Sequence, residues 1–215
     1  MKKRAIQLVF YIVYCLLALV GFLLDFNIPA GKLTGRPFVF YTSLSNMCCS
    51  VFIFAALFHR IRRRTGDFCP RGKFVLVVMI LVTAIVYNLL LNTHDSWQEY
   101  FASAKNALYH LILPVLFCLD WFLFYRRGTV KPSYPLLAVF GPALYVVYIL
   151  IRAAIVTSAD IPVSILYPYF FLNLDRLGWN GFSLWMAILL PALLALGYTL
   201  YALDRLLGRK AALPV

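Results

Sequence analysis

The chain has 215 residues, of which 63% are hydrophobic and 13% are charged, with 20 Lys and Arg against 8 Asp and Glu. An average soluble chain is roughly 45–50% apolar and about 25% charged, so this composition excludes a water-soluble globular protein. The basic residues stand in short segments between apolar runs. That pattern is typical of membrane topology, and no nucleic-acid partner is expected.

Six apolar runs are each near the ~20 residues that cross about 30 Å of hydrocarbon. The first follows a basic tripeptide and imitates a secretory signal peptide, but it is too long for the apolar part of one and lacks a small-x-small cleavage site. We therefore predict an all-α polytopic membrane protein that forms a single integral membrane domain over residues 1–215. Its predicted spans are 5–26, 38–61, 74–91, 106–125, 135–157 and 182–206.

Lys and Arg are distributed unequally between the two sets of connecting segments. Fifteen lie before the first span, between the second and third, between the fourth and fifth, and at the C-terminus. The other set holds only Lys32, Arg36, Lys105 and Arg176. By the positive-inside rule, both termini are expected in the cytoplasm.

Cysteine and histidine usage bears on cofactors. The five cysteines show no CxxC spacing and no paired extracellular framework, so neither disulfides nor a zinc site are indicated. The only histidines are His59, His94 and His110, and no two share a helical face. We expect no metal site and no cofactor.

Polar residues inside the spans are the informative ones, because each costs a few kcal/mol unless it faces protein or water. Thr42 and His110 each lie about four residues, or ~6 Å, below the outer ends of their predicted spans. Further polar residues fall near the same depth in the outer leaflet: Asp25, Asn46, Asn88, Asn106 and Arg152. The presence of polar residues from several spans at one depth predicts a functional site in the outer leaflet.

Several of these residues also have ordinary structural interpretations. The Thr42 hydroxyl commonly bonds back to the carbonyl four residues earlier, that of Phe38, and Asn46 could belong to a small-residue surface for helix packing. An ionisable His110 inside the membrane favours function. Pro114 removes the helical partner of the His110 carbonyl and should bend the helix there.

Three other residues, Arg152, Tyr148 and Asp120, bear on the proposed site. Arg152 either binds an anionic lipid group, snorkels to the outer interface or pairs with Asp25, while Tyr148 packs or lines the route inward. Asp120 lies ten residues beyond His110, about 15 Å along the helix, so it cannot orient that ring. We expect Asp120 to face the cytoplasmic interface or the Arg126 region. Candidate orienters of His110 are Asn46, Asn88, Asn106, Asp95 and Glu99.

Three short motifs make the chain resemble the androgen-induced-protein family of multispanning membrane proteins, whose animal members include hydrolases of fatty acid esters of hydroxy fatty acids. They are the stretch at residues 40–46, the run from His110 through Pro114 to Trp121, and Tyr-Pro-Tyr-Phe-Phe-Leu-Asn before the last span. The resemblance implies Thr42 as nucleophile and His110 as its partner. The basic termini and short loops suggest a bacterial member, hence a bacterial cytoplasmic membrane.

The expected function is therefore intramembrane hydrolysis of a lipid ester, with His110 as general base for Thr42. Supporting roles are expected from Asn46, Asn88 and Asn106, and from Arg152 and Tyr148 beside a lipid. Two alternatives stay open: a small-molecule or proton-linked transporter, and a lipid-binding protein without catalysis. The substrate and the oligomeric state are not predicted.

Overall fold

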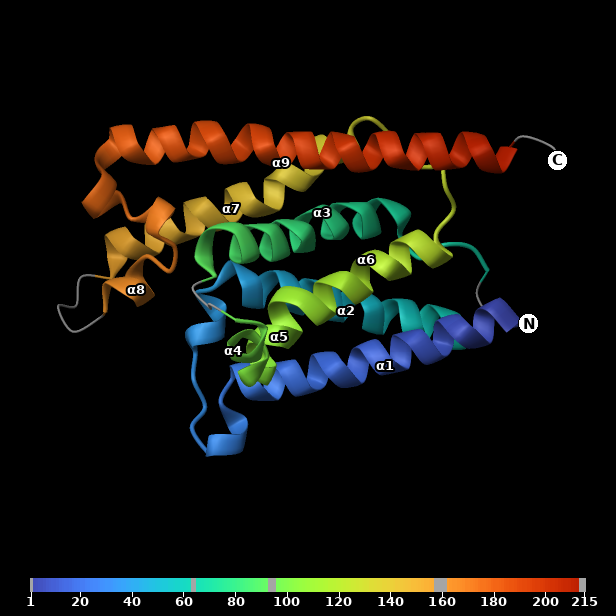
Figure 1. Cartoon of the computed structure of the whole chain (residues 1–215), viewed down its shortest axis with the longest axis horizontal. Helices are drawn as coiled ribbons and strands as arrows, with labels where there is room; N and C mark the ends of the chain where they lie inside the picture. The colour runs from blue at the N-terminus through green and yellow to red at the C-terminus, as the bar shows by residue number, and fades with distance from the viewer. Residues whose placement is uncertain (1, 63–64, 93–95, 157–161, 213–215) are drawn as a thin grey trace.

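A computed structural model describes residues 2–62, 65–92, 96–156 and 162–212, and every regular element in those ranges is a helix (Figure 1). Six helical stretches are long and apolar enough to cross a membrane. They are Lys3–Asp25, Tyr41–Ile61, Pro70–Leu91, Ala104–Phe124, Tyr134–Ile155 and Leu174–Arg209. The predicted all-α architecture with six spans is confirmed.

Some spans contain more than one helical element. The long helices are α1 (Lys2–Asp25), α2 (Tyr41–Ile61), α3 (Pro70–Val86), α6 (Leu113–Phe124), α7 (Tyr134–Ile155) and α9 (Leu174–Ala212). Two π-helical segments, η3 (Tyr87–Leu91) and η4 (Leu108–Ile112), extend α3 and join α5 (Ala104–Ala107) to α6. Short elements fill the connections: η1 (Ile28–Ala30), η2 (Arg36–Phe38), α4 (Trp97–Ala102), α8 (Val163–Leu166) and η5 (Phe170–Leu172).

Three span boundaries differ from prediction for local reasons. The second span begins at Tyr41 and not at residue 38, because Arg36–Phe38 forms a 3₁₀ turn around Pro37. The third begins at Pro70, since proline is well suited to the first turn of a helix. The last helical stretch begins at Leu174 and contains a break at Gly178, whose φ of 61° is in the left-handed region.

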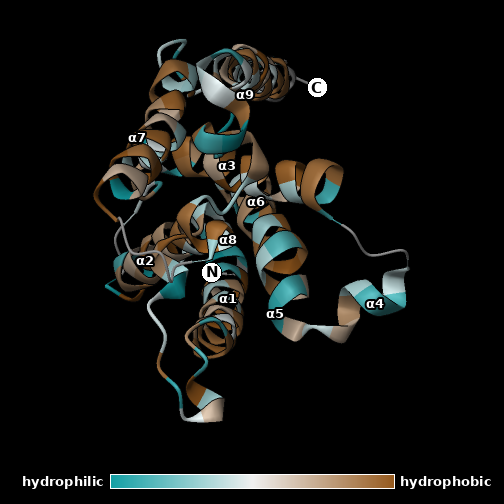
Figure 2. Ribbon diagram, turned by 90° about the vertical axis from the view of Figure 1, so that its left-hand side faces the viewer, coloured by the Kyte–Doolittle hydropathy of each residue, from teal (hydrophilic) through white to brown (hydrophobic). Residues whose placement is uncertain are grey.

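The helices pack with α3 at the centre of the bundle. It contacts α2 and α6 on one side and α7 on the other, while α1 packs on α2 and α9 packs on α7 (Figure 2). The first residues of α1 and the last of α9 lie at the same end of the molecule, which we call the terminal end (Figure 1). The opposite end carries α4, α8 and η5, and we call it the loop end.

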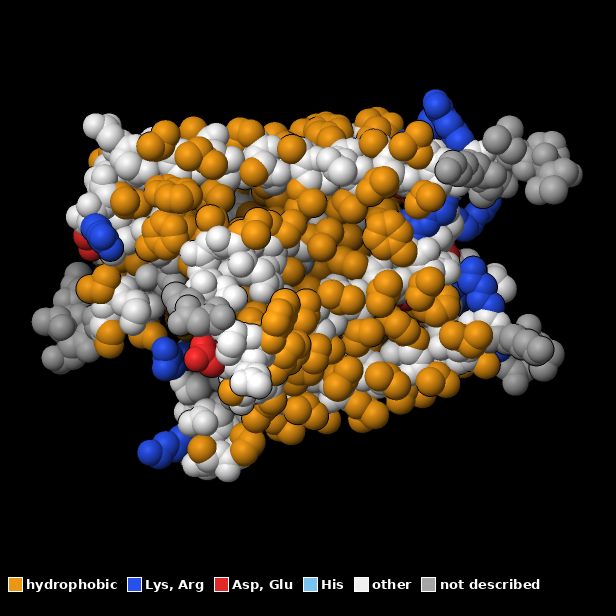
Figure 3. Space-filling model, viewed as in Figure 1, with side chains coloured by type: hydrophobic (Ala, Val, Ile, Leu, Met, Phe, Trp, Pro, Cys, Tyr) orange, Lys and Arg blue, Asp and Glu red, His pale blue; other side chains and the backbone are white. Residues whose placement is uncertain are grey.

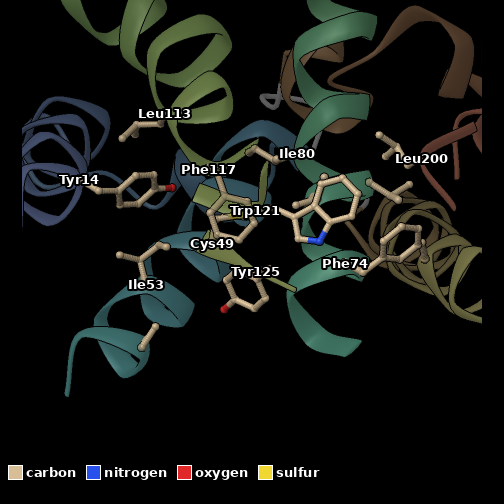
Figure 4. Packing of buried hydrophobic residues seen from close by; sticks show 14 of the residues in the cluster. Tyr14, Cys49, Ile53, Phe74, Ile80, Leu113, Phe117, Trp121, Tyr125 and Leu200 are labelled. Carbon is tan, nitrogen blue, oxygen red and sulfur yellow. The ribbon is translucent and has the colours of Figure 1, made fainter. Parts of the chain in front are cut away.

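The largest buried cluster joins α1, α2, α3 and α6. Tyr14, Ile53, Phe74, Leu113 and Phe117 are almost completely inaccessible and interdigitate there (Figure 4). In a bilayer the lipid tails are as apolar as these side chains, so close packing contributes more to helix association than removal from water does. The cluster separates the polar groups of the loop end from those of the terminal end.

Hydrophobic side chains also cover much of the outer surface in a broad band between the two ends (Figure 3). Val9 and Leu16 on α1, Val51 on α2 and Phe140 on α7 are each at least 59% exposed. Basic side chains gather mainly at the terminal end (Figure 3). This distribution is what a protein embedded in lipid requires.

The terminal end contains buried ion pairs that the sequence did not indicate. Lys73 Nζ lies 2.7 Å from Asp120 Oδ2, and both side chains are completely buried. The same ammonium group lies 3.2 Å from the ring centroid of Phe117. The expectation that Asp120 faces the Arg126 region or the interface was therefore wrong. Lys73 was counted with a connecting segment, but α3 begins three residues before it and carries it inward.

Asp204 of α9 organises the connection between α6 and α7. Its carboxylate accepts a hydrogen bond from the Val130 N–H at 2.9 Å and lies 3.8 Å from the Arg127 guanidinium, and its carbonyl accepts the Gly128 N–H. Gly128 has a φ of 75°, which a residue with a side chain rarely adopts. The loop can approach α9 this closely because Gly208 has no side chain.

Replacing Gly208 by alanine should destabilise the protein by about 1–3 kcal/mol, the usual cost of forcing a group into a filled space. The added Cβ would lie 2.6 Å from the Cα of Gly128, and a backbone atom cannot move aside cheaply. Thermal unfolding in detergent would measure the effect. Gly35→Ala is the matched control, since a Cβ there meets no atom within 4 Å; equal behaviour of the two variants would contradict the close approach.

Candidate functional site

Two π-helical segments meet near the loop end. The ring of Tyr87 in η3 stacks on the imidazole of His110 in η4, with centroids 3.4 Å apart and planes 10° apart. A π-helical turn places one extra residue in the helix and occurs often at functional sites. The two π-helical segments therefore support a functional site at the depth predicted for His110.

Pro114 explains part of this geometry. Because proline has no N–H, it cannot serve the carbonyl of His110 in the α register or that of Tyr109 in the π register. Side-chain amides from two other helices meet these carbonyls: Asn46 Nδ2 donates to Tyr109 O at 3.0 Å, and Asn88 Nδ2 donates to His110 O at 3.2 Å. The amide nitrogens of Asn46 and Asn88 thus satisfy carbonyl groups of the π-helical turn that precedes Pro114.

The imidazole of His110 is oriented by Asn106, one turn earlier. His110 Nδ1 lies 2.8 Å from Asn106 Oδ1 and 3.2 Å from Asn106 O. Since both neighbours are oxygens, we assign the proton to Nδ1, which leaves Nε2 as an acceptor. Asn106 is itself held by its amide, which donates to Tyr100 O at 3.2 Å. Of the proposed orienters, Asn106 is in place, and Asp95 lies outside the described residues.

Three tyrosines hold the start of α2. Tyr145 donates a hydrogen bond to Val39 O at 2.8 Å, and Tyr148 donates to Phe38 O at 3.1 Å. The hydroxyl of Tyr169 accepts from the Thr42 N–H at 3.3 Å and lies 3.5 Å from Thr42 Oγ1. These contacts fix the first turn of α2. They also place the phenolic hydroxyl of Tyr169 beside the hydroxyl of Thr42.

A cavity of about 510 Å³ begins at Thr42 and extends between α3, α7 and α9. Its walls are mainly aliphatic and aromatic, and Tyr87 and Tyr169 form part of them. Exposed residues Val147 and Leu190 also line it, so the cavity reaches the lipid-facing surface between α7 and α9. This is the form of a site for an apolar chain with a few polar groups at one end.

Thr42 and His110 are close in level but are not joined directly. The Asn46 amide donates both to Thr42 O, at 2.8 Å, and to Tyr109 O, so one side chain bridges the two backbone segments. No hydrogen bond links the Thr42 hydroxyl to the imidazole among the described residues. Tyr87 lines the cavity and stacks on His110, whereas His110 itself is not among the residues that line the cavity.

Arg152 lies at the loop end, away from the Thr42 cavity wall. Its guanidinium donates to Ile165 O at 2.7 Å and to Leu166 O at 3.4 Å, and so ties α7 to the end of α8. The suggested pairing with Asp25 is not formed, because Asp25 Oδ1 lies 3.2 Å from Lys105 Nζ. Among the described residues, no three His, Cys, Asp or Glu side chains are grouped to hold a metal ion.

Sequence reasoning missed Tyr87 and Tyr169 as members of the site. Tyr169 was included only as part of the Tyr-Pro-Tyr-Phe-Phe-Leu-Asn motif before the last span, with no role assigned to it. Its separation from Thr42 by 127 residues leaves no periodic signal to connect them. Tyr87 was not predicted, although it directly precedes Asn88, which was.

The arrangement can do two things chemically. It can hold an apolar chain in the cavity, and it can present the Thr42 hydroxyl, flanked by a phenol, to a polar group at the end of that chain. The comparisons with known proteins found no family model, no curated protein and no solved structure that matches this chain.

Proposed function

We propose that the protein is an intramembrane hydrolase of lipid esters, with Thr42 as nucleophile and His110 as general base. One observation carries the proposal: the Thr42 hydroxyl stands at the polar end of an apolar cavity that opens toward lipid. A volume of about 510 Å³ falls within the roughly 300–1,000 Å³ range of ligand sites. An acyl chain can occupy it with its ester at Thr42.

In this mechanism Thr42 Oγ1 attacks the ester carbonyl while His110 Nε2 accepts the hydroxyl proton. The Tyr169 O–H donates to the oxyanion. The tetrahedral intermediate breaks the bond to the alcohol oxygen, which takes the proton from the imidazolium. An acyl group then remains on Thr42, and a water molecule deprotonated by His110 releases it as a carboxylic acid.

Asn106 supports this role because it fixes the tautomer with Nε2 unprotonated. The mechanism also requires a movement. Tyr87 must turn out of its stack on His110 so that the imidazole reaches the Thr42 hydroxyl, and catalytic hydrogen bonds often tighten only when substrate binds. Because Tyr87 is one of the residues that line the cavity, a lipid bound there can displace it.

Lipid binding without catalysis is the second candidate, and the missing contact between Thr42 and His110 favours it. Proton-linked transport has less support. The polar groups of the two ends are separated by the buried apolar cluster that includes Ile53, Leu113 and Phe117. We further propose, from the distribution of Lys and Arg, that the terminal end faces the cytoplasm of a bacterial cell.

Covalent labelling by a lipophilic fluorophosphonate tests the nucleophile. We expect the label at Thr42 in the wild type and in Thr42→Ser, which keeps the hydroxyl, and no label in Thr42→Ala. Thr199→Ala is the matched control, because Thr199 is an exposed hydroxyl on α9 bonded to its own helix. A label that persists in Thr42→Ala would assign the nucleophile elsewhere, whereas lipid retained by an unlabelled wild type would favour binding alone.

A further inference from the structure

A second cavity, of about 400 Å³, lies at the terminal end between the starts of α3 and α7. It is lined by Arg71, Lys131, Ser133, Tyr134, Leu136 and Leu137. We propose that this cavity binds the phosphate headgroup of an anionic phospholipid. The proposal does not depend on any chemistry at Thr42, which lies at the other end of the bundle.

Within the described ranges, no carboxylate pairs with the cations of this cavity. In the part of the chain that the structure describes, three acidic side chains occur at the terminal end. Asp120 pairs with Lys73, Asp204 pairs with Arg127, and Asp67 accepts the Arg126 N–H at 2.8 Å. Neither Arg71 nor Lys131 forms an ion pair within the described chain. Two cations that line one cavity without a carboxylate attract an anion, and basic pockets between spanning helices are typical sites for lipid headgroups.

The surrounding structure fixes the backbone beside both cations. Arg71 lies two residues before Lys73, whose buried pair with Asp120 anchors the first turn of α3. Lys131 follows Val130, whose N–H is bound by the buried Asp204 carboxylate at 2.9 Å. Between them, the rings of Phe74 and Tyr134 pack with centroids 6.2 Å apart. The fold therefore fixes the backbone positions from which the two cationic side chains extend.

Ser133 supplies a further polar group. It occupies the N-cap position of α7, but its side chain caps no N–H of that helix, so the hydroxyl is available to a ligand. The positive end of the α7 dipole adds to the attraction for an anion.

An apolar surface leads away from the cavity and identifies the ligand as a lipid. Leu136, Phe140 and Leu144 are 56%, 65% and 52% exposed and follow one another at four-residue spacing on α7. They form a continuous row along the lipid-facing side of the helix. A phospholipid with its phosphate between Arg71 and Lys131 has its acyl chain along this row, an arrangement that free phosphate cannot use.

Native mass spectrometry of the full chain tests this proposal. The protein is mixed with equal amounts of phosphatidylglycerol and phosphatidylcholine that carry the same acyl chains. We expect retention of phosphatidylglycerol over phosphatidylcholine, and we expect Arg71→Gln/Lys131→Gln to reduce that preference roughly 5- to 30-fold, since each cation near an anionic lipid contributes about a fivefold effect. Arg71→Lys, which keeps the charge, should retain most of it.

The matched control is Arg62→Gln/Arg205→Gln, which removes two exposed charges from the same end outside the cavity. An equal loss in the control would show general attraction to the interface and would overturn the site. Displacement of phosphatidylglycerol by millimolar inorganic phosphate in the wild type would assign the cavity to a soluble anion and would overturn the lipid assignment. Unchanged elution in size-exclusion chromatography verifies that the variants are folded.

Discussion

Thr42→Ala and His110→Ala should each abolish hydrolysis of a lipid ester, with a loss in kcat/KM of about 10²- to 10⁴-fold, the contribution of a positioned general base and its nucleophile. The two side chains serve the same proton transfer, so removing either stops the same step. The double variant should therefore lose little beyond either single variant. The measurement is release of palmitate from p-nitrophenyl palmitate by protein reconstituted in nanodiscs.

Thermal unfolding of the same variants provides the control. Thr42 and His110 have different hydrogen-bond partners, Tyr169 and Asn106, so their structural contributions should add within a few tenths of a kcal/mol. Additive loss of stability with non-additive loss of activity is the expected combination. Hydrolysis at the wild-type rate by Thr42→Ala would remove the enzyme proposal and leave lipid binding as the function of the cavity.

Asp120→Ala should destabilise the protein by about 3–5 kcal/mol, because it leaves the Lys73 ammonium buried without its counter-charge. Lys73→Met should have a similar cost for the converse reason. The double variant Lys73→Met/Asp120→Leu should recover most of the loss, since a well-packed apolar pair replaces a buried ion pair at little net cost. Unfolding in detergent, followed by heat or by a denaturing detergent, gives the three values.

Lys32→Met is the control for this series, because Lys32 is exposed at the loop end and its replacement should change stability little. If Asp120→Ala were as stable as Lys32→Met, Lys73 would have to be neutral or solvated in the native protein. A double variant no better than the single ones would indicate that Phe117, which packs over the ammonium, cannot accommodate an apolar side chain in its place.

Much of the fold follows from hydrophobic length. A bilayer requires about 20 apolar residues per span and requires backbone groups to be satisfied within the helix, so six long apolar runs leave little choice of architecture. The boundaries were harder to predict. Phe38 is apolar and was therefore placed in the second span, but Pro37 favours a 3₁₀ turn over Arg36–Phe38. The break at Gly178 depends on a single backbone conformation.

The site was predictable where its residues share a helix. Asn106 and His110 are four residues apart, so they share a helical face, and Pro114 indicates an irregular turn beside them. The π register of η3 and η4 has no comparable sequence signature, so the stack of Tyr87 on His110 was not foreseen. Lys73 was missed for another reason: a lysine in a basic segment is usually solvated, and only the partner on α6 shows that it is buried.

The double hydrogen bond of Asn46 has a consequence for how a lipid enters. Because this amide joins the backbone of α2 at Thr42 to that of η4 at Tyr109, the cavity wall at Thr42 is tied to the helix that carries His110. The opposite wall, formed by α7 and α9, carries Pro142 and Pro191 within its helices and has exposed residues at its seam. We therefore expect α7 and α9 to separate at their seam when a lipid enters, while the hydrogen bonds of Asn46 keep Thr42 tied to the helix that carries His110.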